Sequence, residues 1–313
     1  MNKRLILVLI CVILLVITGC QTGVQTKNTA DNIRSGTQGI VMNFMPNAPP
    51  DKVYQGDDVS FIVELKNKGA YPEESGAFEG KLEITGFDQS AIQGSWDGGN
   101  MISPNLEGKT QTNIEGGYEV KTFNARVSVP FNGNSYSPKV IVHSCYRYQT
   151  IAEPKVCIDP NPYEVVSEKK VCLIKDITMS GQGAPVSVTK IEEDISSENV
   201  IFKIYIKNVG GGRVVSSSAF GSYSGSRCPL DLNINDLDKV WVRAELSYDG
   251  SPECTPLGTE SDPVRLNTAG EGVIRCKFSK PTSEFAFETP LYVQLDYAYS
   301  SSIEKTIKII NIK

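Results

Sequence analysis

Two segments with the same alternating pattern most constrain the fold of this chain. In residues 59–65 and 200–206 apolar side chains occupy every second position, and each segment runs into Lys-Asn-x-Gly, at 66–69 and at 207–210. A period of two is typical of a β-strand with one buried face, and Asn and Gly tolerate the positive φ of a tight turn. Gly, Ser, Asn and Pro recur at short intervals elsewhere, so the sequence predicts an all-β protein.

A second strand, near the end of each half, is also repeated. Val140, Val142, Tyr146 and Tyr148 match Val293, Leu295, Tyr297 and Tyr299. We expect a hairpin after each strand, through residues 152–154 and 300–302, with return strands at 156–158 and 307–309. Two matches in the same order indicate a duplication. We therefore predict two antiparallel β-sandwiches of seven or eight strands, a first repeat at 37–165 and a second repeat at 166–313, with the boundary in Asp159-Pro160-Asn161-Pro162.

The N-terminus has the features of an export signal. Two basic residues precede an apolar run at 5–17, and Ile17-Thr18-Gly19-Cys20 resembles the lipobox of prokaryotic lipoproteins. The resemblance implies a signal peptide at 1–19, a lipid on Cys20 and an extracytoplasmic body facing the exterior of the cell membrane. The alternative is an uncleaved membrane helix, although the run is shorter than the ~20 residues of a span. Residues 20–36 are polar and aperiodic, which predicts a flexible tether after Cys20.

The charge of the chain restricts its partners. The formal charge is −5 and becomes −7 without residues 1–19, because Lys3 and Arg4 leave and no acid does. Lys and Arg form no cluster, so we do not expect nucleic acid as a partner. We expect contact with the membrane through the N-terminal lipid or signal anchor, and a surface protein or glycan as a further partner.

Six cysteines remain once Cys11 leaves with the signal and Cys20 takes the lipid, and they are expected to form disulfides: Cys145, Cys157, Cys172, Cys228, Cys254 and Cys276. An even set in an exported chain favours three bonds. A zinc site is disfavoured, since no Cys-x-x-Cys occurs and the sequence has one His. The strand register predicts Cys145–Cys157 across the first hairpin. In the second repeat we favour Cys172–Cys228 and Cys254–Cys276, although four cysteines allow three connectivities.

The strand followed by Lys-Asn-x-Gly resembles the immunoglobulin-like modules of archaeal and bacterial surface proteins, of the kind called CARDB or S-layer-associated. The stretches 39–44, 48–50 and 181–186 look like uncharacterised exported archaeal proteins. The resemblance implies two tandem immunoglobulin-like sandwiches on a cell surface and carries no catalytic residue. It leaves archaeal or bacterial origin open.

Candidate catalytic and metal-binding residues are few. His143 alternates with strand residues and is expected to be solvated, which leaves no Ser-His-Asp site. Residues 231–242 begin like a calcium loop, but the sixth and twelfth positions are Asp236 and Val242, so an EF-hand is excluded. A different calcium site from Asp231, Asp236 and Asp238 is less favoured than a loop with Asx turns. We expect no catalytic site, cofactor or metal.

Residues 87–117 show almost no strand pattern and form the segment best suited to specificity. Trp96 and Asp97 within it are the candidate ligand contacts, although a Trp that closes the end of the sandwich is the more ordinary interpretation. The leading hypothesis is a non-enzymatic, membrane-anchored surface lipoprotein that acts as a structural, adhesive or protein-docking module. The alternatives are a carbohydrate-binding or adhesion module that uses 87–117 and an extracytoplasmic hydrolase.

Overall fold

The computed structural model describes residues 33–128, 133–163, 170–220, 227–249 and 251–312. The predicted signal, Cys20 and most of the predicted tether lie outside the described residues. The first repeat contains β1 (Ile40–Phe44), β2 (Lys52–Tyr54), β3 (Asp58–Asn67), β4 (Gly80–Thr85), β5 (Ile92–Trp96), β6 (Tyr118–Val127), β7 (Ser135–Tyr136), β8 (Lys139–Ala152) and β9 (Lys155–Ile158).

The second repeat contains β10 (Ile177–Thr178), β11 (Val186–Ile195), β12 (Asn199–Asn208), β13 (Arg213–Val215), β14 (Lys239–Leu246), β15 (Glu253–Thr255), β16 (Val264–Arg265), β17 (Glu271–Ser279), β18 (Phe287–Thr306) and β19 (Lys308–Ile310), with two short 3-10 turns at Ser217–Ala219 and Ile234–Asp236. The all-β, antiparallel prediction is confirmed. Among the described residues, no helix is long and apolar enough to span a membrane.

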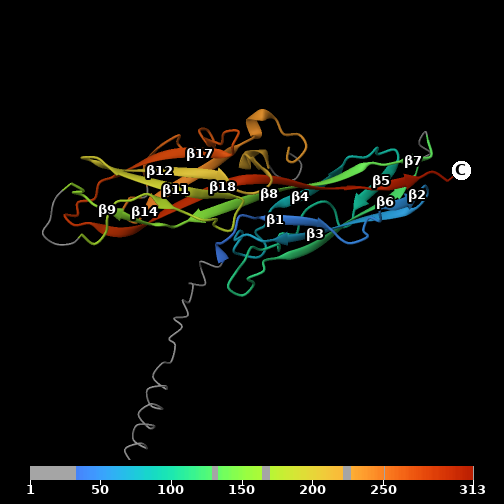
Figure 1. Cartoon of the computed structure of the whole chain (residues 1–313), viewed down its shortest axis with the longest axis horizontal. Coiled ribbons are helices and arrows are strands. Elements are labelled where there is room, and N and C mark those ends of the chain that lie inside the picture. The colour runs from blue at the N-terminus through green and yellow to red at the C-terminus, as the bar shows by residue number, and fades with distance from the viewer. Residues whose placement is uncertain (1–32, 129–132, 164–169, 221–226, 250, 313) are drawn as a thin grey trace, which may run out of the picture.

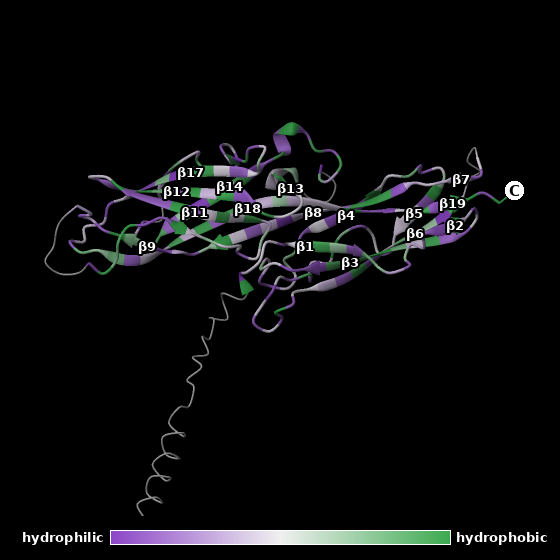
Figure 2. Cartoon of the chain, in the orientation of Figure 1, coloured by the Kyte–Doolittle hydropathy of each residue, from purple (hydrophilic) through white to green (hydrophobic). Residues whose placement is uncertain are grey.

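The two alternating segments form the strands that their pattern predicts. In β3 the side chains of Val59, Phe61, Val63 and Leu65 are buried, and the residues between them are partly exposed. β12 buries Phe202, Ile204 and Ile206 in the same way. Figure 2 shows hydrophobic and hydrophilic residues alternating along the strands. Burial of this one face drives each strand against the opposite layer.

Each repeat has its own outer sheet, and the two repeats share the facing sheet (Figure 1). The outer sheets have the orders β1-β3-β6-β5 and β10-β11-β12-β17-β15. The facing layer is a single sheet with the order β16-β14-β18-β8-β4. Its central pair, β8 and β18, runs antiparallel from Ala152 opposite Val293 to Lys139 opposite Thr306. We call this pair the seam; the sheet continues across the predicted boundary between the repeats.

The ends of the two long seam strands are exchanged between the repeats. β9, which follows β8, pairs with Phe287–Pro290 at the start of β18. β19, which follows β18, pairs with β2 and β7 of the first repeat, so the C-terminus lies at that end of the molecule (Figure 1). Ile307 and Ile309 are fully buried in a cluster with Val53 and Phe61. Each repeat therefore completes the core of the other.

Both predicted hairpins are wrong. β9 pairs with β18 rather than folding back on β8, and β18 continues through Ser300–Ser302 to Thr306 without a turn. A local hairpin would pair each return strand only with its predecessor. The exchanged arrangement lets the seam strands pair with each other over their whole length, and it gives each return strand an apolar site in the other repeat.

The six cysteines form three disulfides, and one predicted pairing is confirmed. Cys254–Cys276 joins β15 to β17, with Cα atoms 4.0 Å apart. The predicted bonds Cys145–Cys157 and Cys172–Cys228 are wrong. Cys145 is bonded to Cys228 (Cα–Cα 5.8 Å) and Cys157 to Cys172 (5.7 Å). β9 leaves β8 to pair with β18, which separates Cys157 from its predicted partner, and the Cys145–Cys228 bond links the two repeats.

Candidate functional site

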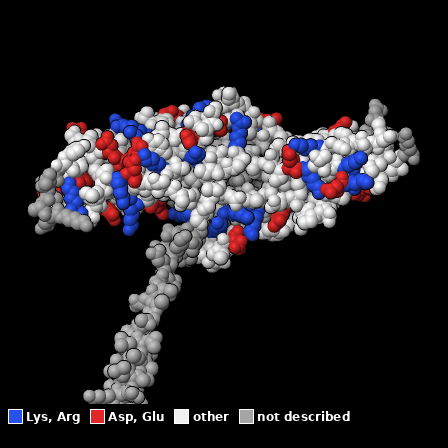
Figure 3. All heavy atoms as spheres, viewed as in Figure 1, with Lys and Arg blue, Asp and Glu red and all other residues white. Residues whose placement is uncertain are grey.

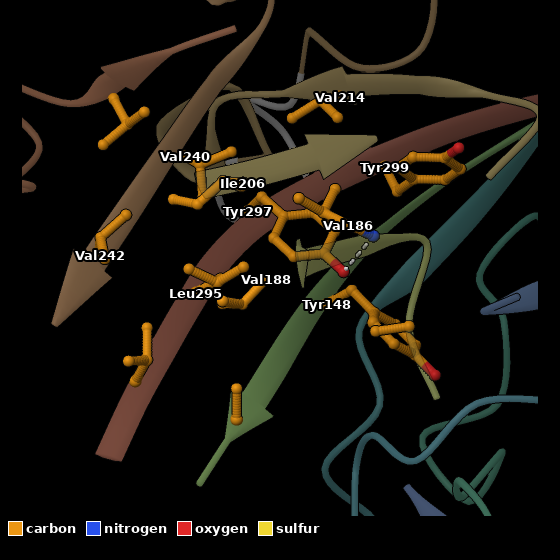
Figure 4. Close-up of a cluster of buried hydrophobic side chains, with 14 of the residues drawn as sticks. Tyr148, Val186, Val188, Ile206, Val214, Val240, Val242, Leu295, Tyr297 and Tyr299 are labelled. Carbon is orange, nitrogen blue, oxygen red and sulfur yellow. Dashed lines mark hydrogen bonds between the residues drawn. The ribbon is translucent and has the colours of Figure 1, made fainter. Parts of the chain in front are cut away.

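Four buried tyrosines occupy the inner face of the seam. Tyr146 lies opposite Tyr299, and Tyr148 lies opposite Tyr297. The rings of Tyr146 and Tyr148 are 5.7 Å apart, and those of Tyr297 and Tyr299 are 6.4 Å apart. Burial raises the pKa of Tyr146 and Tyr297 well above the ordinary value of 10, so both stay neutral. Figure 4 shows Tyr297 among aliphatic side chains, with its hydroxyl accepting a hydrogen bond from Val186 N at 3.3 Å.

Two of the tyrosine hydroxyls donate hydrogen bonds to the asparagine side chains of the Lys-Asn-x-Gly segments. The same contacts occur in both repeats. Tyr148 Oη donates to Asn67 Oδ1 (3.1 Å), and Asn67 Nδ2 donates to the carbonyl of Tyr71 (2.8 Å). Tyr299 Oη donates to Asn208 Oδ1 (3.0 Å), and Asn208 Nδ2 donates to the carbonyl of Gly212 (2.9 Å). The recurrence supports the duplication. It also aligns Tyr71 with Gly212, and the following residues Pro72 and Arg213 with each other.

A cavity of about 290 Å³ lies beside the seam, and we call it the seam groove. Its lining is Arg34, Ala70, Tyr71, Pro72, Glu73, Glu74, Ala77, Gln149, Ile151 and Gln182. The walls thus come from the first described residues, the segment after β3, the end of β8 and the start of the second repeat. Arg34 donates to Glu73 (2.9 Å) and to Glu153 (2.7 Å), which ties the N-terminal segment to both sides of the groove. Gly183 N donates to Gly36 O (2.9 Å) beside it.

The surroundings of the groove are acidic. The carboxylates of Glu73, Glu74 and Glu153 outnumber the guanidinium of Arg34. Burial raises the pKa of Tyr71, and the nearby charges of Asp296 and Glu79 act in the same direction, whereas the charge of Arg147 acts in the opposite one. Acidic and basic side chains are interspersed over the face seen in Figure 3. The local excess of carboxylates therefore makes the groove more favourable to a cation than to an anion.

Trp96 and Asp97, the predicted ligand contacts, lie away from the seam groove. Residues 92–96 of the segment expected to lack strands form β5, which pairs with β6. The prediction missed it because Ile92 and Trp96 are its only large apolar residues. The half-buried indole packs edge-on against Phe123, with ring centroids 5.5 Å apart, and Asp97 is exposed. This packing gives Trp96 a role in the core, and ligand contact at Trp96 and Asp97 stays a prediction.

The other candidate residues have protein partners. His143 is half-buried, its Nε2 lies 3.0 Å from Thr85 Oγ1, and burial lowers its pKa. Both carboxylate oxygens of Asp236 accept from Arg227, at 3.1 and 2.7 Å, so this side chain is committed to an ion pair. Within the described ranges, no group of three or more His, Cys, Asp and Glu residues is arranged to hold a metal ion.

Sequence reasoning did not find the seam groove. Its walls are brought together by the pairing of β8 with β18 and by contacts of Arg34, neither of which leaves a local pattern. The sequence did contain one sign of the groove. Two residues after each Lys-Asn-x-Gly segment the repeats differ, with Tyr71-Pro72 in the first repeat and Gly212-Arg213 in the second. A proline at an aligned strand position indicates a change in backbone pairing.

Comparison with known proteins identifies no family for the chain. No family model matches it, and no curated protein matches it significantly. Among solved structures it is similar to the C-terminal domain of the Streptococcus agalactiae AgI/II polypeptide BspA, with 9% identity and a TM-score of 0.16 over 88% of this chain and 100% of that one. It is also similar to the collagen adhesin CNA of S. aureus, with 6% identity and a TM-score of 0.17 over 90% and 94%. A third structure is the Enterococcus faecalis MSCRAMM ACE, described as binding its ligands by the collagen hug model, with 7% identity and a TM-score of 0.16 over 89% and 97%.

Proposed function

We propose that the protein is a non-enzymatic, membrane-anchored surface protein whose body is a rigid docking module. The observation that carries this proposal is the position of the first described residues, which lie against the middle of the body. Arg34 and Gly36 contact both repeats at the seam, through Glu73, Glu153 and Gly183. An N-terminal anchor would therefore hold an elongated body near its middle and leave both of its ends away from the point of attachment (Figure 1).

The disulfides support an extracytoplasmic location. Bonds of this kind persist in oxidising compartments and are rare in the cytosol. Together with the lipobox resemblance of residues 17–20, they favour a lipid-anchored protein outside the cell membrane. A glycan partner at Trp96 has less support, because that ring packs against Phe123 rather than standing free.

The test is the mass and location of the chain in a lipoprotein-processing host. The membrane-extracted protein should lack residues 1–19 and carry the added mass of a lipid, and Cys20→Ser should abolish lipidation. Cys11→Ser is the matched control, because Cys11 lies within the predicted signal. A Cys20→Ser chain that is still cleaved after Gly19 and still membrane-bound would refute lipid anchoring, and an intact N-terminus on the wild-type chain would establish the uncleaved helix instead.

A further inference from the structure

The outer edge of β8 is paired along one part and unpaired along the next. Its ladder with β4 ends at Gly80 opposite Tyr146, and Arg147 N then donates to Glu79 O at 2.9 Å. Alternate residues of an antiparallel strand direct both backbone groups to the same side. The N–H and C=O of Gln149 and Ile151 therefore face away from β18, toward the same edge. The described part of the chain offers no backbone partner to these two amides, and both residues line the seam groove.

The second repeat covers the equivalent edge with its own strand. Arg213 in β13 lies opposite Ser300 of β18, and Val215 lies opposite Ala298. Gln149 follows Tyr148 as Ser300 follows Tyr299, so Gln149 is the counterpart of Ser300. The counterpart of Arg213 is Pro72, which has no N–H to donate to a ladder. Within the described chain, the first repeat consequently leaves Gln149 without the backbone partner that β13 supplies to Ser300 in the second repeat.

We propose that the seam groove binds an extended peptide segment with a basic side chain, added as a strand to the β8 edge at residues 149–151. This inference deepens the proposed docking function and rests on it. Strand addition uses main-chain hydrogen bonds for affinity and alternate side chains for specificity. Gln149 and Ile151 each present one donor and one acceptor, and the groove of about 290 Å³ beside them can receive part of such a segment.

Two observations select a basic segment. β13 provides the native example of a strand at this position, and its residue opposite Ser300 is Arg213. The groove itself is rich in carboxylates, with Glu73 and Glu74 in its lining and Asp296 within hydrogen-bonding distance of Gln149 Nε2 (2.8 Å). A lysine or arginine opposite Gln149 would lie in this acidic field, whereas an acidic side chain would be repelled.

The experiment measures binding of a blocked, fluorescein-labelled Thr-Val-Lys-Val-Thr peptide to the full chain in detergent micelles by fluorescence anisotropy. Ala77→Phe fills the groove from an exposed position and should weaken binding about tenfold or more. Ala269→Phe, in an exposed loop of the second repeat, is its control and should bind as the wild type does. Glu74→Lys should weaken binding about threefold or more, and Glu260→Lys should not.

The position of the peptide is checked with a benzophenone-labelled version and mass spectrometry, which should find crosslinks within residues 70–77 and 147–154. A Thr-Val-Glu-Val-Thr peptide should bind about tenfold more weakly than the lysine peptide. Equal binding to Ala77→Phe, crosslinks confined to other segments, or no binding of the lysine peptide at about 1 mM would each overturn the proposal. The groove variants retain Cys20, so failure here leaves the anchoring result intact, and loss of anchoring in Cys20→Ser leaves the peptide affinity unchanged.

Discussion

The exchange of terminal strands makes the first repeat depend on the last residues of the chain. Ile309 is fully buried beside Val53, with which it pairs, and Ile307 is also fully buried in the same cluster. Truncation of a buried isoleucine to alanine costs about 2–5 kcal/mol of folding free energy. The double variant Ile307→Ala/Ile309→Ala should therefore lose about 4–10 kcal/mol, which approaches the whole stability of a domain, about 5–15 kcal/mol.

Each repeat contains one of the two tryptophans, so tryptophan fluorescence can report the stability of each repeat separately. Trp96 packs against the cluster that contains Ile309, whereas Trp241 lies on β14 of the second repeat. In a Trp241→Phe background, urea unfolding followed by Trp96 fluorescence should show Ile309→Ala lowering the free energy of unfolding by about 2–5 kcal/mol. Ile312→Ala is the matched control; this side chain is 62% exposed, so the change should stay within about 0.5 kcal/mol.

A loss below about 1 kcal/mol for Ile309→Ala, or a loss equal to that of Ile312→Ala, would refute the dependence of the first repeat on β19. The same reasoning applies to the first repeat expressed alone. Residues 37–165 lack Ile307 and Ile309, so this fragment should be largely unfolded and should gain structure when a peptide of residues 303–313 is added. Cooperative unfolding of the fragment without the peptide would contradict the exchange.

Three further predictions concern other contacts of the fold. Replacing Cys145 and Cys228 together by Ala should lower the melting temperature under oxidising conditions, with a loss of about 4.5 kcal/mol from the chain-entropy estimate for a sequence separation of 83; equal stability of the variant and the non-reduced wild type would contradict the link. Tyr148→Phe should cost about 1–3 kcal/mol in urea unfolding, because it leaves the fully buried Asn67 short of a donor, and Tyr299→Phe should cost less, because its partner Asn208 is only partly buried; the reverse order would count against this account. Burial and the charge of Asp159 raise the pKa of Glu193 from 4.5 to about 8. The folded protein therefore binds a proton at Glu193 more tightly than the unfolded chain does, and its stability falls as the pH rises from about 5 to 8. Glu193→Gln should therefore raise the melting temperature at pH 9 more than at pH 5, and an equal shift at both values would rule this out.

Local patterns predicted the strands but not their partners. The alternation over 59–65 and 200–206 is a local feature, and the structure has strands where the sequence predicts them. The Lys-Asn-x-Gly segments end both strands, but none of their residues adopts the positive φ that was expected of a tight turn. The Cys254–Cys276 bond was accessible for a similar reason, since its strands β15 and β17 are adjacent in the sheet and the two cysteines are only 22 residues apart in sequence. The alternation within a strand determines which of its faces is buried, but it does not determine which strand lies beside it.

The seam shows where sequence reasoning failed. The pairing of Cys145 with Cys157 was predicted from a local hairpin, whereas its actual partner, Cys228, comes from a segment of the other repeat. A turn at residues 152–154 was consistent with a hairpin and equally consistent with a strand that crosses to β18. Two similar halves offer nearly equivalent partners to each return strand, so only the whole assembly decides between them.

The exchanged strands also impose an order on folding. β2 and β7 of the first repeat pair with β19, the most C-terminal of the described strands, so the first repeat cannot close its core until residues 308–310 have been synthesised. Contacts between residues so far apart in the chain form slowly and leave apolar surface exposed in the meantime. The two repeats differ in this respect, because β9, the strand that the first repeat supplies to β18, precedes the second repeat in the chain, whereas β19 lies at the far end of that repeat.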